Sequence, residues 1–433
     1  MHHKKSNLTV AFLACLLMAL WGCSTKKSKP EPADDIEEVP EFTPIKLTSG
    51  PKQHWFGYYD KLEVSPTGRY VLACEVDTIH RSPTNEDVLK VGMIDLEDGN
   101  KWIELGESRS WGWQQGCMLQ WIPGSANEII WNDIQDRKFV SHVMNVDTRE
   151  RRTLPKAIYT LSNDGNFALG TEFNRIQNMR PGYGYPGVED PYADQKAPEG
   201  IGIYKMDITT GKVDLLISLK EIASLPNLGE NLDDYWHYFN HLLISPDDKR
   251  FIFLHRWRQE MYLNNKQATG GFTTRMFTAN TDGSDKYMLD PSGNTSHFIW
   301  KDSQSVCMWT KPVGMESGFY LFTDKTDKVV AVGEGIMTHN GHNTYLPNTN
   351  GDWILNDTYP QGEQRLQSLY LYHVPTRKKV LLGEFHEPAK YKGEVRCDLH
   401  PRSSRDGRYI IFDSTHGGDG RQMYLIDLKG FIK

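Results

Sequence analysis

The sequence predicts an all-β fold, a seven-bladed β-propeller closed by an N-terminal strand that completes the last blade. The first observation is a phrase that recurs seven times, in which a short polar turn precedes β-forming residues that end in a charged or amide residue. Its copies are residues 65–75, 122–133, 162–172, 245–256, 301–311, 347–357 and 404–414. A period of about 50 residues made only of candidate strands is typical of propellers, in which each repeat is one four-stranded blade. The second observation is that the last repeat offers three strands instead of four.

The first 23 residues are expected to be a lipoprotein signal peptide. Residues 2–5 supply positive charge, residues 8–20 form an apolar stretch, and Gly22 precedes Cys23. This pattern is typical of bacterial lipoproteins, in which Cys23 would be lipidated and begin the mature protein. An ordinary cleaved signal peptide is the alternative. We therefore expect an extracytoplasmic protein of a Gram-negative bacterium, anchored by lipid to the outer or inner membrane.

Residues 24–42 are predicted to be a flexible tether, because their Lys, Pro, Asp and Glu content cannot bury apolar surface. Residues 43–433 are expected to form one catalytic propeller domain, which we expect to be monomeric. The net charge of −7 gives no basic field, which argues against nucleic acid as a partner. Four cysteines after the signal are expected to be buried free thiols, because no Cys-x-x-Cys spacing occurs. They are Cys74, Cys117, Cys307 and Cys397.

The blades follow one another along the chain. The first is predicted at residues 58–107, and the others begin near residues 111, 158, 237, 296, 341 and 395. The missing strand of the last blade is assigned to residues 43–49, since such closure removes the open edges of the ring. Residues 174–200 interrupt the third blade without any strand period. We expect them to form an ordered surface loop that could serve as a lid.

The connections that enter each inner strand and leave each second strand open onto the same end of a propeller. Residues at the inner-strand entrances are His54, Tyr58, Tyr59, Trp113, Gln114, Gln115, Tyr238, Asn240, His241, Ser296, His297, His339, Asn340, His342, Arg396, Asp398 and His400. The ends of second strands add Glu75, Asn132, Glu172, Arg175, His255, Arg256, Arg258, Lys311, Asn356, Asp357, Asp413 and His416. Histidine therefore recurs at one structural position in blades four to seven.

We expect at least two of His241, His297, His342 and His400 to share a functional site. Imidazoles combined with a carboxylate such as Asp398 would make a divalent metal site with open positions. The spacing of Asp398 and His400 places both side chains on one face of a strand. The alternative is that polar groups around the channel satisfy one another through water, as expected for the Asn356–Asp357 and Asn132–Asp133 pairs.

Aromatic and basic residues near the same entrances could bind a sugar acid. Tyr58 and Trp113 are candidates for a stacking platform, although core packing explains them equally well. The planar fork of arginine matches a carboxylate. The candidate substrate-binding residues are Tyr58, Trp113, Gln114, Arg175, Arg258 and Arg396.

Three segments of blades five to seven, residues 296–300, 340–347 and 397–414, resemble the oligogalacturonate lyase family. The resemblance implies a seven-bladed propeller that uses manganese and a histidine base to cleave uronic-acid sugars by β-elimination. His297 and His400 match the family's metal ligands, and His241 lies in the blade that supplies its base. Val395 and Asp398 stand where the family has Gln and a further His, so Asp398 or His342 would have to compensate.

The expected function is therefore an extracytoplasmic lyase that cleaves uronic-acid-containing oligosaccharides or polysaccharides. A divalent metal, manganese in preference to calcium or none, would be held by His297, His342, His400 and Asp398. The metal or Arg256 would stabilise the enolate charge. His241 is the expected base, with Tyr59 or His54 as alternative base or as leaving-group acid. Two other functions stay open: a glycoside hydrolase, for example on rhamnose-glucuronate linkages, with His54, Glu75 or Glu172 as acid or base, and a non-catalytic glycan-binding surface lipoprotein.

Overall fold

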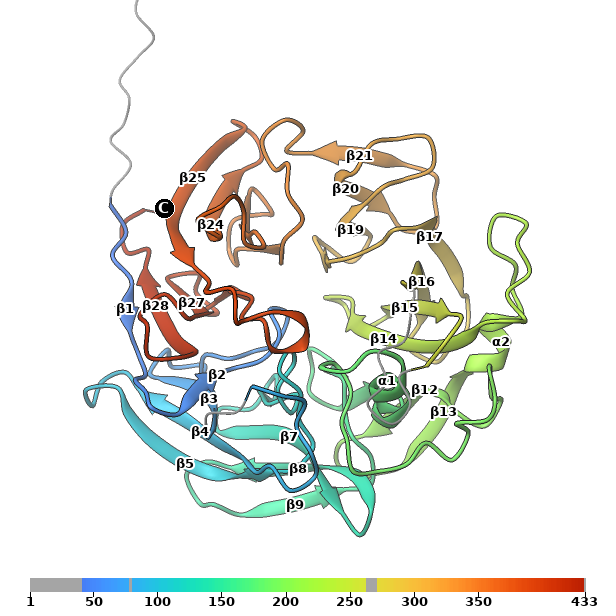
Figure 1. The fold of residues 1–433 in the computed structure, drawn as a ribbon, viewed down its shortest axis with the longest axis horizontal. Helices are drawn as coiled ribbons and strands as arrows, with labels where there is room; N and C mark the ends of the chain where they lie inside the picture. Colours follow the sequence, from blue (N-terminus) through green and yellow to red (C-terminus); the bar gives the residue numbers. More distant parts are fainter. Residues whose placement is uncertain (1–40, 78–79, 262–270, 432–433) are drawn as a thin grey trace, which may run out of the picture. The chain divides into compact units, whose positions relative to one another are not determined.

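The computed structural model describes residues 41–77, 80–261 and 271–431. These residues form seven antiparallel sheets of four strands each, which follow one another around a ring (Figure 1). The predicted seven-bladed all-β propeller is thus confirmed. The predicted signal peptide, Cys23 and nearly all of the tether lie outside the described residues. Within the described part of the chain, no helix has the length and apolarity needed to cross a bilayer.

Each blade is one hydrogen-bonded sheet. Blade one contains β2 (Gln53–Trp55), β3 (Tyr70–Val76), β4 (Leu89–Asp95) and β5 (Lys101–Ser108). Blade two contains β6 (Gln120–Trp121), β7 (Glu128–Gln135), β8 (Lys138–Asn145) and β9 (Arg151–Leu154). Blade three contains β10 (Thr160–Leu161), β11 (Phe167–Gly170), β12 (Gly202–Asp207) and β13 (Val213–Ser218). Blade four contains β14 (Trp236–Ile244), β15 (Arg250–Arg258), β16 (Thr273–Asn280) and β17 (Tyr287–Gly293).

The remaining three blades complete the ring. Blade five contains β18 (Phe298–Trp300), β19 (Ser305–Thr310), β20 (Gly318–Thr323) and β21 (Val329–Val332). Blade six contains β22 (Thr344–Tyr345), β23 (Trp353–Asp357), β24 (Leu366–His373) and β25 (Lys378–His386). Blade seven contains β26 (Arg402–Ser403), β27 (Tyr409–Ser414), β28 (Gln422–Asp427) and β1 (Ile45–Lys46). β1 pairs with β28 in the register Ile45↔Leu425, which is consistent with the expected closure.

The recurring phrase forms the turn between first and second strands of each blade. In four copies its leading serine fixes that turn through its side chain. Ser65 Oγ accepts a hydrogen bond from the backbone N–H of Tyr70 at 3.0 Å, and Ser404 Oγ does the same for Tyr409 at 2.9 Å. Gly68 follows in the left-handed region at φ 77°, which glycine adopts at little cost. The repeat in sequence is therefore a repeated turn geometry.

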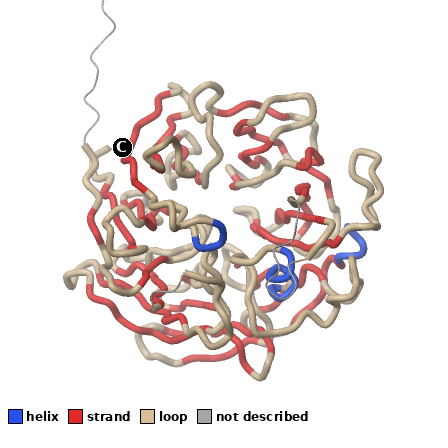
Figure 2. Tube along the Cα trace, viewed as in Figure 1, coloured by secondary structure: helices blue, strands red, loops and turns tan. Residues whose placement is uncertain are grey.

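Several predicted features differ from the observed fold. The first strands of blades two and seven begin at Gln120 and Arg402, and not near residues 111 and 395. Blade one begins at Gln53 and not at residue 58, because the chain leaves the sheet after Trp55 and returns only at Val64, which bridges to Val71. The insertion at residues 174–200 begins inside a helix, α1 (Phe173–Met179), and was predicted as a loop. In the described part of the chain strands otherwise dominate, and the other helical segments there are α2 (Leu219–Ala223) and a 3₁₀ turn at Gly393–Val395 (Figure 2). All four cysteines after the signal are free and buried, as predicted.

A buried ion cluster joins blades one and seven. Arg402 donates from Nε to Glu63 Oε2 at 2.7 Å and from Nη2 to Asp413 Oδ1 at 3.1 Å. The three side chains are at most 1% exposed. Burial raises the pKa of Glu63 to about 7, although Arg402 opposes this shift. Each charge in the cluster is tolerated only because its partners are present.

Replacing Arg402 by methionine is expected to lower the free energy of unfolding by about 3–5 kcal/mol, because two carboxyl groups then stay buried without a cation. Urea denaturation measures this effect. Arg408→Met is the matched control, since Arg408 pairs with Asp427 at a partly exposed site and its loss should cost less than about 1 kcal/mol. Equal losses for the two variants would contradict the role of burial.

A second buried cluster in blade four requires two neutral histidines. Arg275 Nε donates to His255 Nδ1 at 3.0 Å, His255 Nε2 lies 3.0 Å from His237 Nδ1, and His237 Nε2 lies 2.9 Å from the carbonyl of Leu232. Since Arg275 can only donate, each imidazole accepts at Nδ1 and donates from Nε2. Burial lowers the pKa of His237 to about 4 and also lowers the pKa of His255. Protonation of either ring would break this chain of hydrogen bonds.

Stability is therefore expected to fall as pH drops from 6.5 towards 4. The unfolded chain takes up protons below pH 6.5, whereas folded His237 stays neutral down to about pH 4. This stability is fully present above pH 6.5, and His237 alone accounts for about 3 kcal/mol of it. Urea denaturation at pH 7 and pH 4.5 should show a smaller difference for His237→Gln than for the unchanged protein. The same pH difference in both would rule out this origin.

Candidate active site

The structure brings the four predicted histidines of blades four to seven together. The ring of His342 lies 4.1 Å from that of His297 and 4.3 Å from that of His400, measured between centroids. Tyr58 stacks on His241 at 4.9 Å and lies 5.0 Å from the ring of His400. Tyr58 thereby connects His241 to the other three imidazoles. All four histidines are buried.

Local backbone geometry sets the side-chain direction of two of these histidines. His241 lies at a register shift of β14 between Asn240 and Leu243, and its φ is 52°. His400 precedes β26 with φ 42°, while the carbonyl of Leu399 still accepts from the amide of Asp413. A non-glycine residue with positive φ is uncommon and persists where the surrounding structure imposes it. Such irregularities re-aim a side chain relative to a regular strand.

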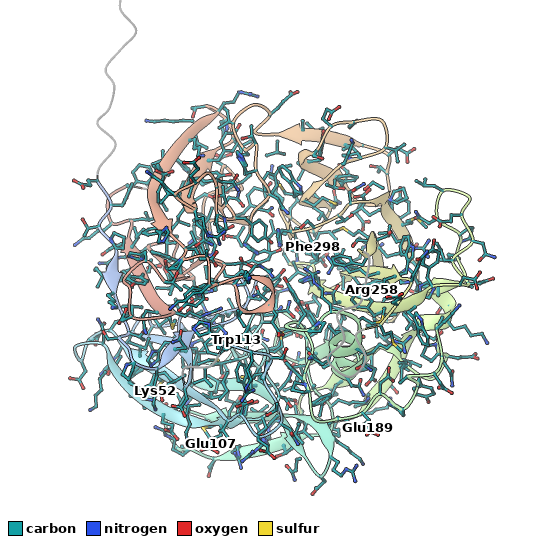
Figure 3. The ribbon with its side chains drawn as sticks, viewed as in Figure 1. Lys52, Glu107, Trp113, Glu189, Arg258 and Phe298 are labelled. Atoms are coloured by element: carbon teal, nitrogen blue, oxygen red, sulfur yellow. The ribbon has the colours of Figure 1, made fainter. Side chains whose placement is uncertain are left out.

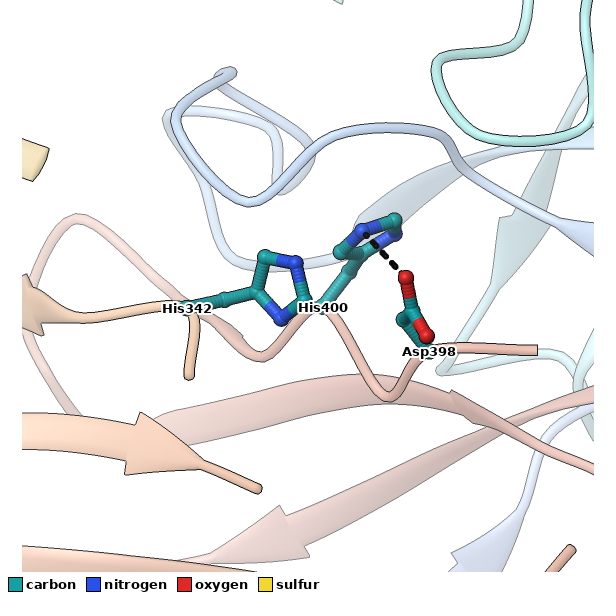
Figure 4. Close-up of side chains that lie close together, drawn as sticks. All are labelled: His342, Asp398 and His400. Atoms are coloured by element: carbon teal, nitrogen blue, oxygen red, sulfur yellow. Dashed lines mark ion pairs between the residues drawn. The ribbon is translucent and has the colours of Figure 1, made fainter. Parts of the chain in front are cut away.

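His342, Asp398 and His400 form a candidate metal centre (Figure 4). One possible ligand atom from each lies within 4.8 Å of the others. Asp357 Oδ2 lies 2.9 Å from His342 Nδ1 and also accepts from the backbone N–H of His400 at 3.2 Å. When His342 donates from Nδ1, its Nε2 carries the lone pair. Among the described residues Nε2 of His342 and Nε2 of His400 are buried without a hydrogen-bond partner.

The chemistry of this donor set fits a divalent transition metal. Burial lowers the pKa of His342 to about 3, and burial followed by His342 lowers the pKa of His400. Both rings are therefore neutral ligands at pH 7. A carboxylate that orients an imidazole through its far nitrogen, as Asp357 does, is the usual support of a metal-binding histidine. Two imidazoles and the Asp398 carboxylate suit manganese or zinc better than calcium.

His297 lies beside this centre and is not one of the three closest donors. Its Nδ1 lies 3.0 Å from Asn340 Oδ1, and its Nε2 lies 3.4 Å from the hydroxyl of Tyr359. Burial and the neighbouring His342 lower its pKa well below the ordinary value. His297 is thus a neutral imidazole next to the candidate ligands, in contact with Asn340 and Tyr359.

His241 occupies a separate part of the site. Its Nδ1 lies 3.3 Å from the hydroxyl of Tyr159, which in turn donates to Gln115 Oε1 at 3.1 Å. Gln115 Nε2 also lies 3.4 Å from Nδ1 of His241. In the tautomer in which Nδ1 carries the proton and Tyr159 accepts it, Nε2 is left as the basic nitrogen, 3.4 Å from the hydroxyl of Tyr58. Burial, followed by Arg256, lowers the pKa of His241. His241 is therefore an unprotonated base at neutral pH.

Two arginines face the histidines without a carboxylate partner. Arg256 donates from Nε to Thr274 at 3.0 Å, but its Nη1 is buried and has no hydrogen-bond partner among the described residues. Nη1 of Arg180 is likewise buried and has no hydrogen-bond partner among the described residues. Both guanidinium groups lie 4.7 Å from the ring centroid of Phe272. Burial, together with Arg180, lowers the pKa of Arg256 to about 10, so this pair of cations is well placed to receive an anion.

Sequence reasoning missed the contribution of the insertion. Arg180 and Tyr183 both come from residues 174–200, and the ring of Tyr183 lies 5.7 Å from that of His241. Arg396 joins the insertion to blade seven, since it donates to the hydroxyl of Tyr183 at 2.7 Å and to Asp398 Oδ2 at 2.8 Å. The insertion was identified as a possible lid, and its arginine and tyrosine content was the available signal.

Three predicted substrate-binding residues help to hold the insertion or its surroundings in place. Arg175 is 2% exposed and donates to the side chain of Asp190 and to four backbone carbonyls, those of residues 192, 195, 196 and 237. Arg258 donates to the carbonyl of Met179 at 2.8 Å. Gln114 donates to the carbonyls of residues 394 and 396. The assignment of Arg175 to substrate is corrected, because all three of its side-chain nitrogens bind the protein, and the assignment of Arg258 and Gln114 stays a prediction.

Two predicted aromatic contacts are also structural. Tyr59 donates its hydroxyl to the carbonyl of Phe298 at 2.9 Å and accepts from the same residue's N–H at 3.0 Å, which corrects its assignment as base or acid. Trp113 is 2% exposed, donates to the carbonyl of Arg81 and packs against Trp55. It is therefore a core residue and not a sugar platform. Phe298, Arg258 and Trp113 lie towards the inner part of the ring in Figure 3.

His54, predicted as an alternative catalytic residue, lies apart from the histidine cluster. Its Nε2 is 3.1 Å from Glu75 Oε2 and its Nδ1 is 2.9 Å from Gln422 Oε1. It lines an open cleft of about 540 Å³, together with Lys52, which lies near the outside of the ring in Figure 3, and Trp102. Glu172 is paired with Lys156 at 2.9 Å. Among the described residues, none of the three predicted hydrolase groups, His54, Glu75 and Glu172, contacts the four clustered histidines.

The comparisons with known proteins concern the fold. No protein-family model matches the sequence, and no curated protein matches it. An oligogalacturonate lyase from Vibrio parahaemolyticus is similar with a TM-score of 0.62 and 14% identity, over 91% of this chain and 98% of its own. An oligogalacturonate lyase in complex with manganese has a TM-score of 0.59 and 15% identity, over 90% and 98%.

The same fold also occurs in a propeller peptidase. A puromycin-hydrolyzing peptidase from Mycobacterium tuberculosis is similar with a TM-score of 0.51 and 12% identity, over 89% of this chain but 55% of its own. At these identities the likeness establishes the fold alone. The chain is a seven-bladed propeller similar over nearly its whole length to oligogalacturonate lyases, as the segments in blades five to seven predicted.

Proposed function

We propose that this protein is a lyase that cleaves uronic-acid-containing oligosaccharides or polysaccharides by β-elimination, assisted by a divalent metal. The observation that carries the proposal is that a neutral base, His241, lies near Arg256 and Arg180 and in the same site as three candidate metal ligands. Nη1 of each arginine has no hydrogen-bond partner among the described residues. All of these groups are buried except Arg180, which is partly exposed, so their charges or lone pairs act with little screening by water. A reaction that removes a proton beside a carboxylate needs all three kinds of group.

Each group in the site has a separate role in the proposed elimination. The proton at C5 of a uronate becomes acidic only if the negative charge that develops on the carboxylate side is stabilised. Arg256 and Arg180 supply hydrogen-bond donors for that carboxylate from one side. His342, Asp398 and His400 would hold the metal, which when bound supplies Lewis acidity towards the same group. His241 accepts the proton at Nε2, while Tyr159 holds its Nδ1.

The structural likeness to an oligogalacturonate lyase in complex with manganese supports manganese as the metal. The preference for an acidic sugar is supported by the two arginines, because a neutral sugar would leave their buried Nη1 groups unpaired. Tyr58 and Tyr183 flank His241, with ring centroids 4.9 Å and 5.7 Å from that of His241.

The direct test is to incubate the purified protein with manganese and with pectic, ulvan and rhamnose-glucuronate oligosaccharides. β-Elimination creates a double bond conjugated with the carboxylate, so the product absorbs in the ultraviolet and loses no mass relative to the substrate. A hydrolase would instead give saturated products that carry an added water. Failure to form unsaturated uronate from all three substrate classes would refute the proposal.

A further inference from the structure

Tyr183 stands out among the tyrosines of the site because it is held between two cations. Arg396 Nη2 donates to its hydroxyl oxygen at 2.7 Å. The guanidinium of Arg180 lies 4.0 Å from the centroid of its ring. Tyr183 is 3% exposed, so both contacts lie where water screens them little. The hydroxyl proton itself has no acceptor in these contacts and stays available to a bound molecule.

The position of Tyr183 is fixed from both sides. Arg396 is held by Asp398 and by the carbonyl of Gly393, which keeps its Nη2 directed at the phenol. The neighbouring Gly182 approaches blade seven so closely that an added Cβ would lie 2.8 Å from the Cβ of Glu394. Since Gly182 also has a φ of 91°, a larger residue would displace the insertion.

This environment makes Tyr183 a stronger acid than its neighbours. Burial alone would raise its pKa, but Arg180 and Arg396 outweigh burial and lower the pKa of Tyr183 below the ordinary value. Burial raises the pKa of Tyr58 and of Tyr359 instead. Tyr159 already donates its proton to Gln115. The phenol of Tyr59 is bound to the backbone of Phe298. The buried hydroxyl of Tyr238 has no hydrogen-bond partner among the described residues, but Tyr238 lacks the direct contact with Arg396 that distinguishes Tyr183.

We propose that Tyr183 is the catalytic acid that protonates the leaving glycosidic oxygen, an inference that rests on the proposed lyase function. As His241 Nε2 takes the C5 proton, the C5–H electron pair forms the C4–C5 double bond. The C4–O4 bond breaks, and O4 takes the phenolic proton of Tyr183. The resulting tyrosinate is stabilised by Arg180 and Arg396. Transfer of the proton from the His241 imidazolium to the tyrosinate restores both groups, so protons and electrons balance.

Proton donation speeds the reaction only when the leaving group is poor. Loss of a catalytic acid should therefore depend on the leaving group, whereas loss of a structural residue should slow both substrates equally. We compare Tyr183→Phe with the unchanged protein on two substrates. The first is the uronate trisaccharide that the unchanged protein cleaves, and the second is the same terminal uronate with 4-nitrophenol as leaving group at O4. The variant is expected to lose about 100-fold or more in kcat on the trisaccharide and less than about 5-fold on the nitrophenyl substrate.

Tyr185→Phe is the matched control. Tyr185 lies on the same insertion and is equally buried, but its hydroxyl accepts from Asn132 Nδ2 at 3.1 Å and its ring stacks on Phe173 at 4.2 Å. The Tyr185→Phe variant should change kcat on the trisaccharide and on the nitrophenyl substrate by the same factor. An equal loss on both substrates, or no loss, would overturn the role of Tyr183 while the lyase function stands. Absence of unsaturated product from the unchanged protein would overturn both.

Discussion

Replacing His342 by alanine is expected to remove bound manganese and to reduce lyase activity below detection. His342 lies between His297 and His400. Asp357 binds Nδ1 of His342, so the lone pair of His342 is on Nε2 and is available to a metal shared with Asp398 and His400. Loss of His342 leaves two candidate ligands, Asp398 and His400, from one segment of blade seven. Even an indirect support of a metal ligand typically contributes 10–100-fold in affinity, and a direct ligand contributes more.

Metal analysis after dialysis and assay of unsaturated product measure the two effects separately. His386→Ala is the control, because His386 is exposed at the end of β25 and binds only the carbonyl of Gln364. It should retain both metal and activity. A His342→Ala protein that binds manganese at the same stoichiometry as the unchanged protein would show that the metal lies elsewhere.

Much of the fold could be predicted because the repeat is a local property. Each copy of the phrase contains its own turn signal, as the hydrogen bond from the amide of Arg250 to Ser245 Oγ illustrates in blade four. Asp248 adopts the left-handed conformation there that glycine adopts in other copies, so the geometry survives a change of residue. The start of blade one was not predictable in this way. Residues 56–63 leave the sheet to place Tyr58 and Tyr59 near the centre, and no local pattern marks that excursion.

The candidate site could be predicted in part for the same reason. The register of the repeat brought His241, His297, His342 and His400 to equivalent positions, and the structure brings their rings together. The role of Asp357 was misjudged, since it was expected to satisfy Asn356 through water. It instead binds the ring of His342 and the backbone of His400, across two blades.

Residues from the insertion were beyond sequence reasoning because their positions depend on contacts distant in the chain. Arg180 and Tyr183 reach the site only because Arg175 ties the insertion to blade four and Gln114 ties blade two to residues 394 and 396. These hydrogen bonds join segments separated by 62 to 282 residues. The same side chains looked like substrate contacts in sequence, because arginine and glutamine at a strand end suit either purpose.

Replacing His241 by glutamine is expected to lower kcat by about 10²–10⁴-fold and to leave bound manganese unchanged. Glutamine fills a similar space and can still bond to Tyr159, but it has no basic nitrogen to accept the C5 proton. His241 is not among the three clustered donor residues, and Tyr58 stacks between it and His400.

Comparison of the His241→Gln and His342→Ala variants distinguishes the catalytic base from a metal ligand. Steady-state kinetics should show a fall in kcat with little change in KM for His241→Gln, because the arginines and the metal that bind the carboxylate are intact. Loss of manganese together with activity in this variant would make His241 a ligand and leave the reaction without an assigned base. Retention of metal with loss of turnover would instead place proton abstraction at His241 in blade four, separate from the candidate metal ligands of blades six and seven.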